Sequence, residues 1–392
     1  MPCHVSRTGG LAASLFALTL LSGPLLSGGA AAQIAVSAND GKAVLVNGVN
    51  TVPDNPPADN VSIIDLNVTP PKVLATVRLP TSLVGPPSSV AVAPDKSFAL
   101  ITAATKLDPA DPRKVVAHNI VSVLDLKSSP PAVIATHETG AGASGVDINR
   151  AGTLALVANR LEGTVSVFAI SGKALTPTGK IPLGDSKSGP AAVAFSPDGK
   201  MALVTRDGDS KVSILTVNGT TVEYSKRDIY AGLKPYPVGI SPKGDWAAIS
   251  NVGMGGGDAD TVSLIDIKAN PPRVVDTITV GQTPEGLTVA PDGKHMVVTV
   301  MNGSNKPTGN PFKSANGLAV VLAVDHLKLS KVTEAKAGTW CQGAAWNRTS
   351  TMVLVQCMVE QEIQIFGFDG KTLKRTGAIK VSGGPAGFGT SP

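Results

Sequence analysis

Residues 190–217, PAAVAFSPDGKMALVTRDGDSKVSILTV, are the stretch that decides the fold of this 392-residue chain. Two apolar segments, residues 192–195 and 201–204, flank the tripeptide Pro197-Asp198-Gly199. Proline presets φ, aspartate bonds to its own backbone and glycine tolerates a positive φ, so the tripeptide predicts a tight turn. The alternation around residues 212–215 predicts a further strand. The stretch therefore predicts three strands joined by a turn and a loop.

The third-strand phrase of this unit recurs along the whole chain. Its seven copies are residues 60–65, 120–125, 164–168, 211–215, 261–266, 317–321 and 362–366. Three copies are followed by a diproline, which begins at Pro70, Pro130 and Pro271. Diproline suits the start of an edge strand, where no backbone N–H is needed for pairing. A fourth, outermost strand is therefore predicted in each repeat.

The first strands of the repeats are centred on apolar anchors that lie 44 to 57 residues apart. This is the spacing of four-stranded propeller blades. The anchors are Val90, Val146, Val193, Val238, Leu287, Ala344 and Phe388. The sequence therefore predicts an all-β chain with seven radial blades.

The last anchor predicts how the ring closes. Residues 385–392, PAGFGTSP, keep the spacing of residues 190–197, and the printed sequence ends there. We expect them to form the innermost strand of the first blade, with its other three strands from residues 42–80, because closure removes the open sheet edge. The alternative gives the innermost position to residues 34–37. Their alternation is one residue out of phase, which would turn their side chains to the wrong face.

The turn signatures and the second strands carry a family resemblance. The turns are Pro94-Asp95, Pro197-Asp198-Gly199, Pro242-Lys243-Gly244 and Pro291-Asp292-Gly293, and the second strands are residues 156–159 (LVAN), 203–206 (LVTR) and 249–251 (ISN). This set resembles the YVTN-repeat, lactonase-like seven-bladed β-propeller family over essentially the whole chain after residue 32. The resemblance implies a fold used by binding proteins, lactone hydrolases and relatives with haem or quinone chemistry. The hydrolases of this family use a catalytic Glu with a supporting Arg and His. The resemblance implies that Glu285 and Arg206 are the counterparts of the Glu and the Arg, and it implies no counterpart of the His.

The first 32 residues predict a secretory signal peptide, followed by a single propeller domain over residues 33–392. Arg7 gives a positive start, residues 11–26 are apolar, and Ala30-Ala31-Ala32 fits a cleavage site. The apolar run is short and interrupted for a membrane span, which needs about 20 residues. We therefore expect a periplasmic or secreted protein without a membrane span. The net charge of +5 is scattered and only 4% of residues are aromatic, which argues against nucleic-acid binding.

Uneven loops and a few polar residues indicate where a ligand could bind. The loops that join second to third strands are long in blade one (residues 48–59), blade two (104–119), blade five (252–260) and blade six (301–316). We expect them to form two ridges, blades one–two and five–six, beside one mouth of the central channel. The polar residues expected at this mouth are Asn159, Arg160, Arg206, Asp207, Asn251 and Glu285. A solvated rim of charges without a ligand is the alternative.

Metal and redox cofactors have little support in the sequence. The histidines after residue 32 lack paired spacing, and no Cys-x-x-Cys-His motif is present. Segments 207–210 and 255–260 offer oxygen ligands, which leaves calcium as the alternative to no cofactor. Cys341 and Cys357 flank the predicted hairpin at residues 346–352 at equal distances, so they should lie opposite each other and form a disulfide.

Three functions remain open from the sequence. The first is a non-catalytic binding or scaffold protein that holds an unknown protein or small polar ligand on its long-loop face. The second is a lactonase-like hydrolase or lyase with Glu285 as base and Arg206 as anion clamp. The third is a periplasmic redox accessory protein.

Overall fold

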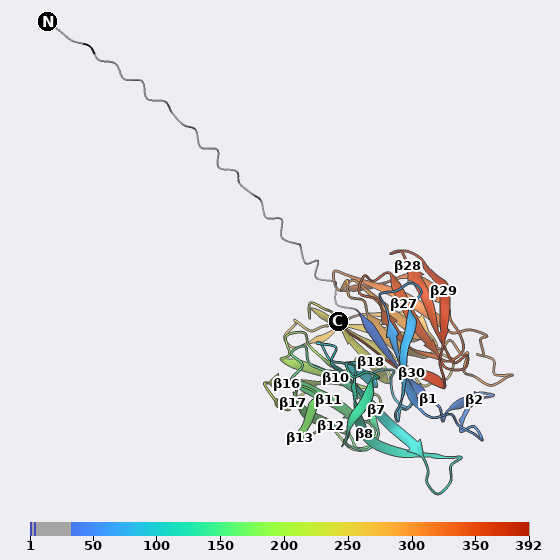
Figure 1. Cartoon of the computed structure of the whole chain (residues 1–392). Coiled ribbons are helices and arrows are strands. Elements are labelled where there is room, and N and C mark those ends of the chain that lie inside the picture. The colour runs from blue at the N-terminus through green and yellow to red at the C-terminus, as the bar shows by residue number, and fades with distance from the viewer. Residues whose placement is uncertain (2–3, 5–32, 392) are drawn as a thin grey trace. The chain divides into compact units, whose positions relative to one another are not determined.

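The seven repeats fold into seven four-stranded antiparallel sheets, which confirms the predicted all-β propeller (Figure 1). The computed structural model describes residues 1, 4 and 33–391. The predicted signal peptide lies, apart from residues 1 and 4, outside the described residues. All seven anchors lie on innermost strands, and all seven third-strand phrases lie on third strands.

From the innermost strand outwards, the first four blades are built as follows. Blade one is β30 (Gly384–Thr390), β1 (Ile34–Asp40), β4 (Asn60–Asp65) and β5 (Lys72–Arg78). Blade two is β6 (Val90–Val92), β7 (Phe98–Leu107), β8 (Val115–Asp125) and β9 (Ala132–Glu138). Blade three is β10 (Ala143–Ile148), β11 (Leu154–Asn159), β12 (Thr164–Ser171) and β13 (Ala174–Pro182). Blade four is β14 (Pro190–Phe195), β15 (Met201–Arg206), β16 (Lys211–Asn218) and β17 (Thr221–Ile229).

The last three blades follow the same order. Blade five is β18 (Pro235–Ile240), β19 (Trp246–Asn251), β20 (Asp260–Asp266) and β21 (Arg273–Gly281). Blade six is β22 (Pro284–Val289), β23 (His295–Val300), β24 (Leu318–Asp325) and β25 (Lys328–Lys336). Blade seven is β26 (Cys341–Trp346), β27 (Met352–Cys357), β28 (Glu362–Phe368) and β29 (Leu373–Lys380). In the part of the chain described, no helix is long and apolar enough to cross a membrane.

The two ends of the domain close the ring, as predicted, but the rest of blade one differs from the prediction. The C-terminal strand β30 is innermost and pairs antiparallel with β1, from Ala35 opposite Thr390 to Asp40 opposite Gly384 (Figure 1). The second strand is therefore β1, and not a strand from residues 42–80. The reason is burial, since β1 is covered by a strand on each side. Residues 44–51 instead form an exposed hairpin, β2 (Val44–Val46) and β3 (Val49–Thr51).

Side chains at the ends of the second strands stitch these strands to the third strands. The Asn159 Nδ2 donates to Thr164 and Ser166, both at 2.9 Å, and its Oδ1 accepts from the Gly140 N–H. Asn39 and Asn251 make the same pair of bonds in blades one and five. The recurring asparagine and serine of the repeat are therefore one hydrogen-bonded unit. A backbone bulge at the start of the innermost strand accompanies each of these pairs.

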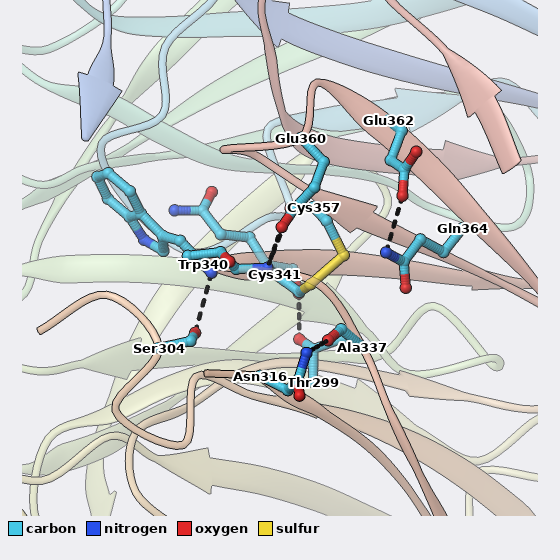
Figure 2. The surroundings of a disulfide bond; sticks show 12 residues. Thr299, Ser304, Asn316, Ala337, Trp340, Cys341, Cys357, Glu360, Glu362 and Gln364 are labelled. Carbon is cyan, nitrogen blue, oxygen red and sulfur yellow. Dashed lines mark hydrogen bonds between the residues drawn. A yellow bond between two sulfur atoms is a disulfide. The ribbon is translucent and has the colours of Figure 1, made fainter. Parts of the chain in front are cut away.

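Blade seven replaces this stitch with the predicted disulfide. Cys341 lies opposite Cys357, and their sulfur atoms are bonded (Figure 2). Cys357 ends the second strand, which is the position of Asn39, Asn159 and Asn251 in blades one, three and five. The predicted register of the hairpin is wrong by one residue, because Trp346 pairs with Val353. A bulge between Cys341 and Ala344 absorbs the difference. The two cysteines therefore meet because two deviations from the predicted register cancel.

Replacing Asn159 with alanine should destabilise the propeller by about 1–3 kcal/mol, because its partners would be left buried and unpaired. Equilibrium unfolding in guanidinium chloride measures this change. The control is Asn55→Ala, since Asn55 is exposed in the loop before β4. Equal free energies of unfolding of the two variants would contradict a stabilising role of the hydrogen bonds from Asn159 to the third strand.

Candidate functional site

The long loops gather at the end of the ring where the second strands end, here called the mouth. The loops at residues 252–259 and 301–317 are irregular, as predicted. The predicted loop at residues 104–119 is shorter, because β7 and β8 extend to Leu107 and from Val115. The blade-one hairpin reaches blade six, where the Asn47 Oδ1 accepts from the Thr308 N–H at 2.7 Å. Lys306 in turn donates to the Gly255 carbonyl at 2.7 Å, so the ridge runs through blades one, six and five and differs from the two ridges predicted.

A plug formed by residues 82–88, between β5 and β6, crosses the channel just below the mouth. The Pro87 carbonyl accepts from Phe388 N–H in blade one at 3.1 Å, and the Ser88 carbonyl accepts from Val146 N–H in blade three at 2.9 Å. A Cβ at Gly85 would collide with the Ser144 hydroxyl, so only glycine fits there. These two bonds go to the blades that flank blade two, but Leu83 of the plug also packs with Met301 of blade six and Trp340 of blade seven. The plug therefore extends across the channel and lies between the mouth and the rest of the channel.

Two positions of each repeat supply the side chains at the mouth. The residue that follows the second strand is Arg160 in blade three and Asp207 in blade four. The residue two before each anchor is Tyr236 in blade five, Glu285 in blade six and Gln342 in blade seven. The other four blades carry a serine or an alanine at this position. Five adjacent blades together build one polar cluster, and Arg160, Asp207, Tyr236 and Glu285 line a cavity of about 300 Å³.

Arg160 provides the positive charge of this cluster. Its guanidinium bonds to the Asp207 carboxylate and lies 5.5 Å from the centre of the Tyr236 ring. Burial alone would lower the pKa of Arg160, but Tyr236, Asp207 and Glu285 outweigh it and the pKa is raised. Burial also raises the pKa of Tyr236, so its hydroxyl stays protonated. The guanidinium is thus a fixed cation beside a neutral phenol.

Glu285 is a buried carboxyl with an unusual proton affinity. Burial raises its pKa to about 8, although the nearby Trp340 indole and the Arg160 guanidinium both oppose this rise. One carboxyl oxygen accepts from the Gln342 side chain at 3.4 Å. A Cβ at the next residue, Gly286, would collide with the Gln342 carbonyl, so this glycine lets the two strands approach. Glu285 therefore exchanges its proton close to neutral pH.

The disulfide holds Trp340 beside Glu285. Trp340 directly precedes Cys341, and its backbone N–H donates to the Ser304 hydroxyl at 3.0 Å (Figure 2). The indole packs with Met301 and Met358 in an apolar cluster at the mouth. Of this cluster, Met301 lines the cavity together with Val252 and Met254, so the lining combines apolar and charged side chains, as in many small-molecule sites.

Several buried polar atoms of this cluster have no hydrogen-bond partner among the described residues. They are Arg160 Nη1, Asp207 Oδ1, Glu285 Oε2, Trp340 Nε1 and Gln342 Oε1. Folded proteins satisfy nearly all such groups, and exceptions call for an explanation. Donors and acceptors gathered at one cavity are the arrangement expected of a polar ligand site.

The other predicted site residues have structural roles. Asn159 and Asn251 stitch strands, as described above. Arg206 occupies the equivalent position in blade four, where it bonds to Asp209 and to the Ser213 hydroxyl and lies 3.7 Å from Asp228. It does not line the mouth cavity. The guanidinium of the site is therefore Arg160.

The predicted metal segments are occupied by other contacts. Asp207 and Asp209 bond to arginines, and Asp260 accepts from the Thr283 N–H at 2.8 Å. Among the described residues, no group of three or more His, Cys, Asp or Glu side chains is placed to hold a metal.

Comparison with known proteins agrees with this fold. The family model "Lactonase, 7-bladed beta-propeller" matches residues 120–238. The chain folds as a seven-bladed β-propeller, and its residues 120–238 are similar to the lactonase family. No curated protein sequence matches it.

Solved structures share the fold at low identity. A candidate 6-phosphogluconolactonase of Bacteroides fragilis superposes with a TM-score of 0.70 at 16% identity, over 92% of this chain and 98% of that one. The periplasmic gluconolactonase of Pseudomonas aeruginosa gives 0.66 at 16%, over 92% and 99%. Hydrazine synthase of Kuenenia stuttgartiensis gives 0.61 at 19%, over 79% and 90%. At these identities the likeness concerns the fold, which serves different chemistries.

The raised pKa of Glu285 predicts a pH-dependent stability. The unfolded chain releases this proton above about pH 4.3, whereas the folded protein keeps it until about pH 8. The contribution of Glu285 to the free energy of unfolding should therefore fall between these values by about 1.4 kcal/mol per pH unit. Glu285→Gln removes this loss. We expect urea unfolding at pH 5 and pH 8 to show that the free energy of unfolding of Glu285→Gln increases relative to that of the wild type as the pH rises. An equal difference between the two proteins at both pH values would contradict the raised pKa of Glu285.

Proposed function

We propose that this protein hydrolyses lactones of small polyhydroxylated acids at the mouth cavity. The observation that carries the proposal is the group of buried, unpartnered donors and acceptors around Glu285 and Arg160. The family match favours this hydrolase over the non-catalytic binding role that the sequence suggested first. The hydroxyl groups of such a ligand offer both donors and acceptors, as these protein atoms require.

The chemistry follows from the proton affinity of Glu285. As a carboxylate it takes a proton from a water molecule, whose oxygen forms a bond to the lactone carbonyl carbon. The ring C–O bond then breaks, and the Glu285 carboxylic acid returns the proton to the departing alkoxide. A pKa of about 8 suits both steps near neutral pH. Lactone and water thus combine into a single product, the hydroxy acid.

Two neighbours of Glu285 assist in this scheme. The free Nη1 of Arg160 stabilises the negative charge that develops on the carbonyl oxygen. The Trp340 indole lies beside the Glu285 carboxyl and lowers its pKa, while Met254 and Met301 supply apolar lining of the cavity. Lys234 also lines the cavity and favours substrates that carry an acidic group.

The test is turnover of a lactone panel that includes glucono-δ-lactone, followed by pH-stat titration of the acid released. Glu285→Gln should lower kcat by about 10²–10⁴-fold because it removes the proton carrier. Arg160→Met should lower it by about 10²-fold or more. Below pH 8 the wild-type rate should rise with pH, as the carboxylate fraction increases.

The controls are Glu223→Gln and Arg227→Ala, which change exposed residues of β17. Trp340→Phe keeps an aromatic ring without the N–H, and should raise the pKa of Glu285 further, so that the rate rises only at higher pH. Absence of turnover in the wild type over the whole panel, or full activity of Glu285→Gln, would overturn the hydrolase.

We further propose that residues 1–32 are removed on export to the periplasm or the medium, where the disulfide can form. Within residues 33–391, the first strand begins at Ile34, one residue after the proposed new N-terminus at Gln33. The mass of the protein recovered from its source should correspond to a start at Gln33, with no thiol available for alkylation. Retained residues 1–32 or two alkylated cysteines would contradict this.

A further inference from the structure

A second hollow lies away from the mouth cavity, between blades one and two. Its volume is about 470 Å³. Its walls include Pro56 and Pro57 from the loop before β4, Leu79 after β5, and Leu107 at the end of β7. These side chains are apolar, so the hollow can cover the carbon skeleton of a small molecule. None of the described residues that line it also lines the mouth cavity.

The polar groups of this hollow are mostly basic. Arg78 and Lys106 line it, and no ion pair joins either side chain to any residue in the described part of the chain. Lys42 also lines the hollow, but its charge is balanced by Asp40 at 3.3 Å and Asp59 at 2.6 Å. With three cations against the two carboxylates, one net positive charge remains at the hollow.

The acid of the hollow is already engaged. Besides Lys42, the Asp59 carboxylate accepts from the Gly41 N–H at 2.9 Å and from the Thr81 N–H at 3.1 Å. Asp59 is therefore not free to pair with Arg78 or Lys106. The electrostatic potential inside the hollow is positive, which favours an anion.

His118 lies in the same hollow and has an unused polar atom. Its Nδ1 is buried without a hydrogen-bond partner among the described residues. Burial lowers the pKa of His118, and the charges of Lys106 and Lys42 lower it further. The imidazole is therefore neutral at pH 7, but a bound anion would offset those charges and raise its pKa.

We propose that the hollow between blades one and two binds a small organic anion, with an apolar body against the prolines and leucines and an acidic group at Arg78 and Lys106. The net positive charge repels cationic molecules of the same shape and gives neutral ones no electrostatic attraction. This site is independent of the proposed hydrolase, because its groups come from other elements and a different cavity.

Benzoate is the probe, and the ring signals of His118 are the readout in NMR spectra of ¹⁵N-histidine-labelled protein, assigned with His118→Asn. Benzoate should shift these signals saturably and raise the pKa of His118. Benzylamine, a cation of similar shape, should leave them unchanged. The variant carrying Arg78→Ala and Lys106→Ala should bind benzoate at least 10-fold more weakly.

Two variants separate this site from its surroundings. Lys72→Ala removes an exposed cation at the other end of β5 and should bind benzoate as the wild type does. Glu285→Gln should also bind it unchanged at His118, whatever happens to lactone turnover. The proposal is overturned if benzoate leaves the His118 signals unchanged, if benzylamine binds equally well, or if the double variant keeps its affinity while circular dichroism shows it folded.

Discussion

Pairing between the first and last strands of the domain is the constraint on which the other features depend. Seven sheets arranged radially fit together only if the ring closes, and here the β1–β30 ladder closes it within one blade. The Gln33 side chain adds to this closure, since its amide donates to the Trp346 carbonyl at 3.3 Å and accepts from the Arg348 N–H at 2.6 Å. The mouth cluster draws side chains from five adjacent blades, so its geometry exists only in the closed ring.

Stability and ligand binding use neighbouring residues of the same repeat. Asn159 turns inward and stitches its blade, whereas Arg160, one residue later, faces the mouth. The same division separates Arg206 from Asp207 in blade four. Because the two roles fall on different positions, the mouth can vary between blades while the stitch is kept. In blade seven the hydrogen-bonded asparagine is replaced by Cys357, which is covalently bonded to Cys341. Trp340 directly precedes Cys341.

The repeat made the blades and the ring closure predictable, because both depend on spacing along the chain. The disulfide was predicted correctly from a register that is one residue off, because the bulge between Cys341 and Ala344 compensates the error. The sequence could have identified Arg160, and not Arg206, as the arginine of the site. Aligning the repeats places Arg206 at the position of Asn159 and Asn251, which bond to the third strand. The same alignment would have found Tyr236 and Gln342 beside Glu285. The plug and the hollow around His118 were not predictable. The segment that joins β5 to β6 is longer than the corresponding segments of the other blades, and the hollow depends on contacts between blades.

The plug has a consequence for molecular traffic. Below it the channel continues as a separate cavity of about 400 Å³, lined by Pro87 and Ser88 at its upper end and by none of the mouth residues described. Residues 82–88 lie between the two cavities, so a ligand bound at Glu285 enters and leaves through the mouth. Product release and substrate binding therefore use the same opening. The loops around this opening, which expose the apolar side chains of Met254 and Phe312, control the rate of exchange with solvent.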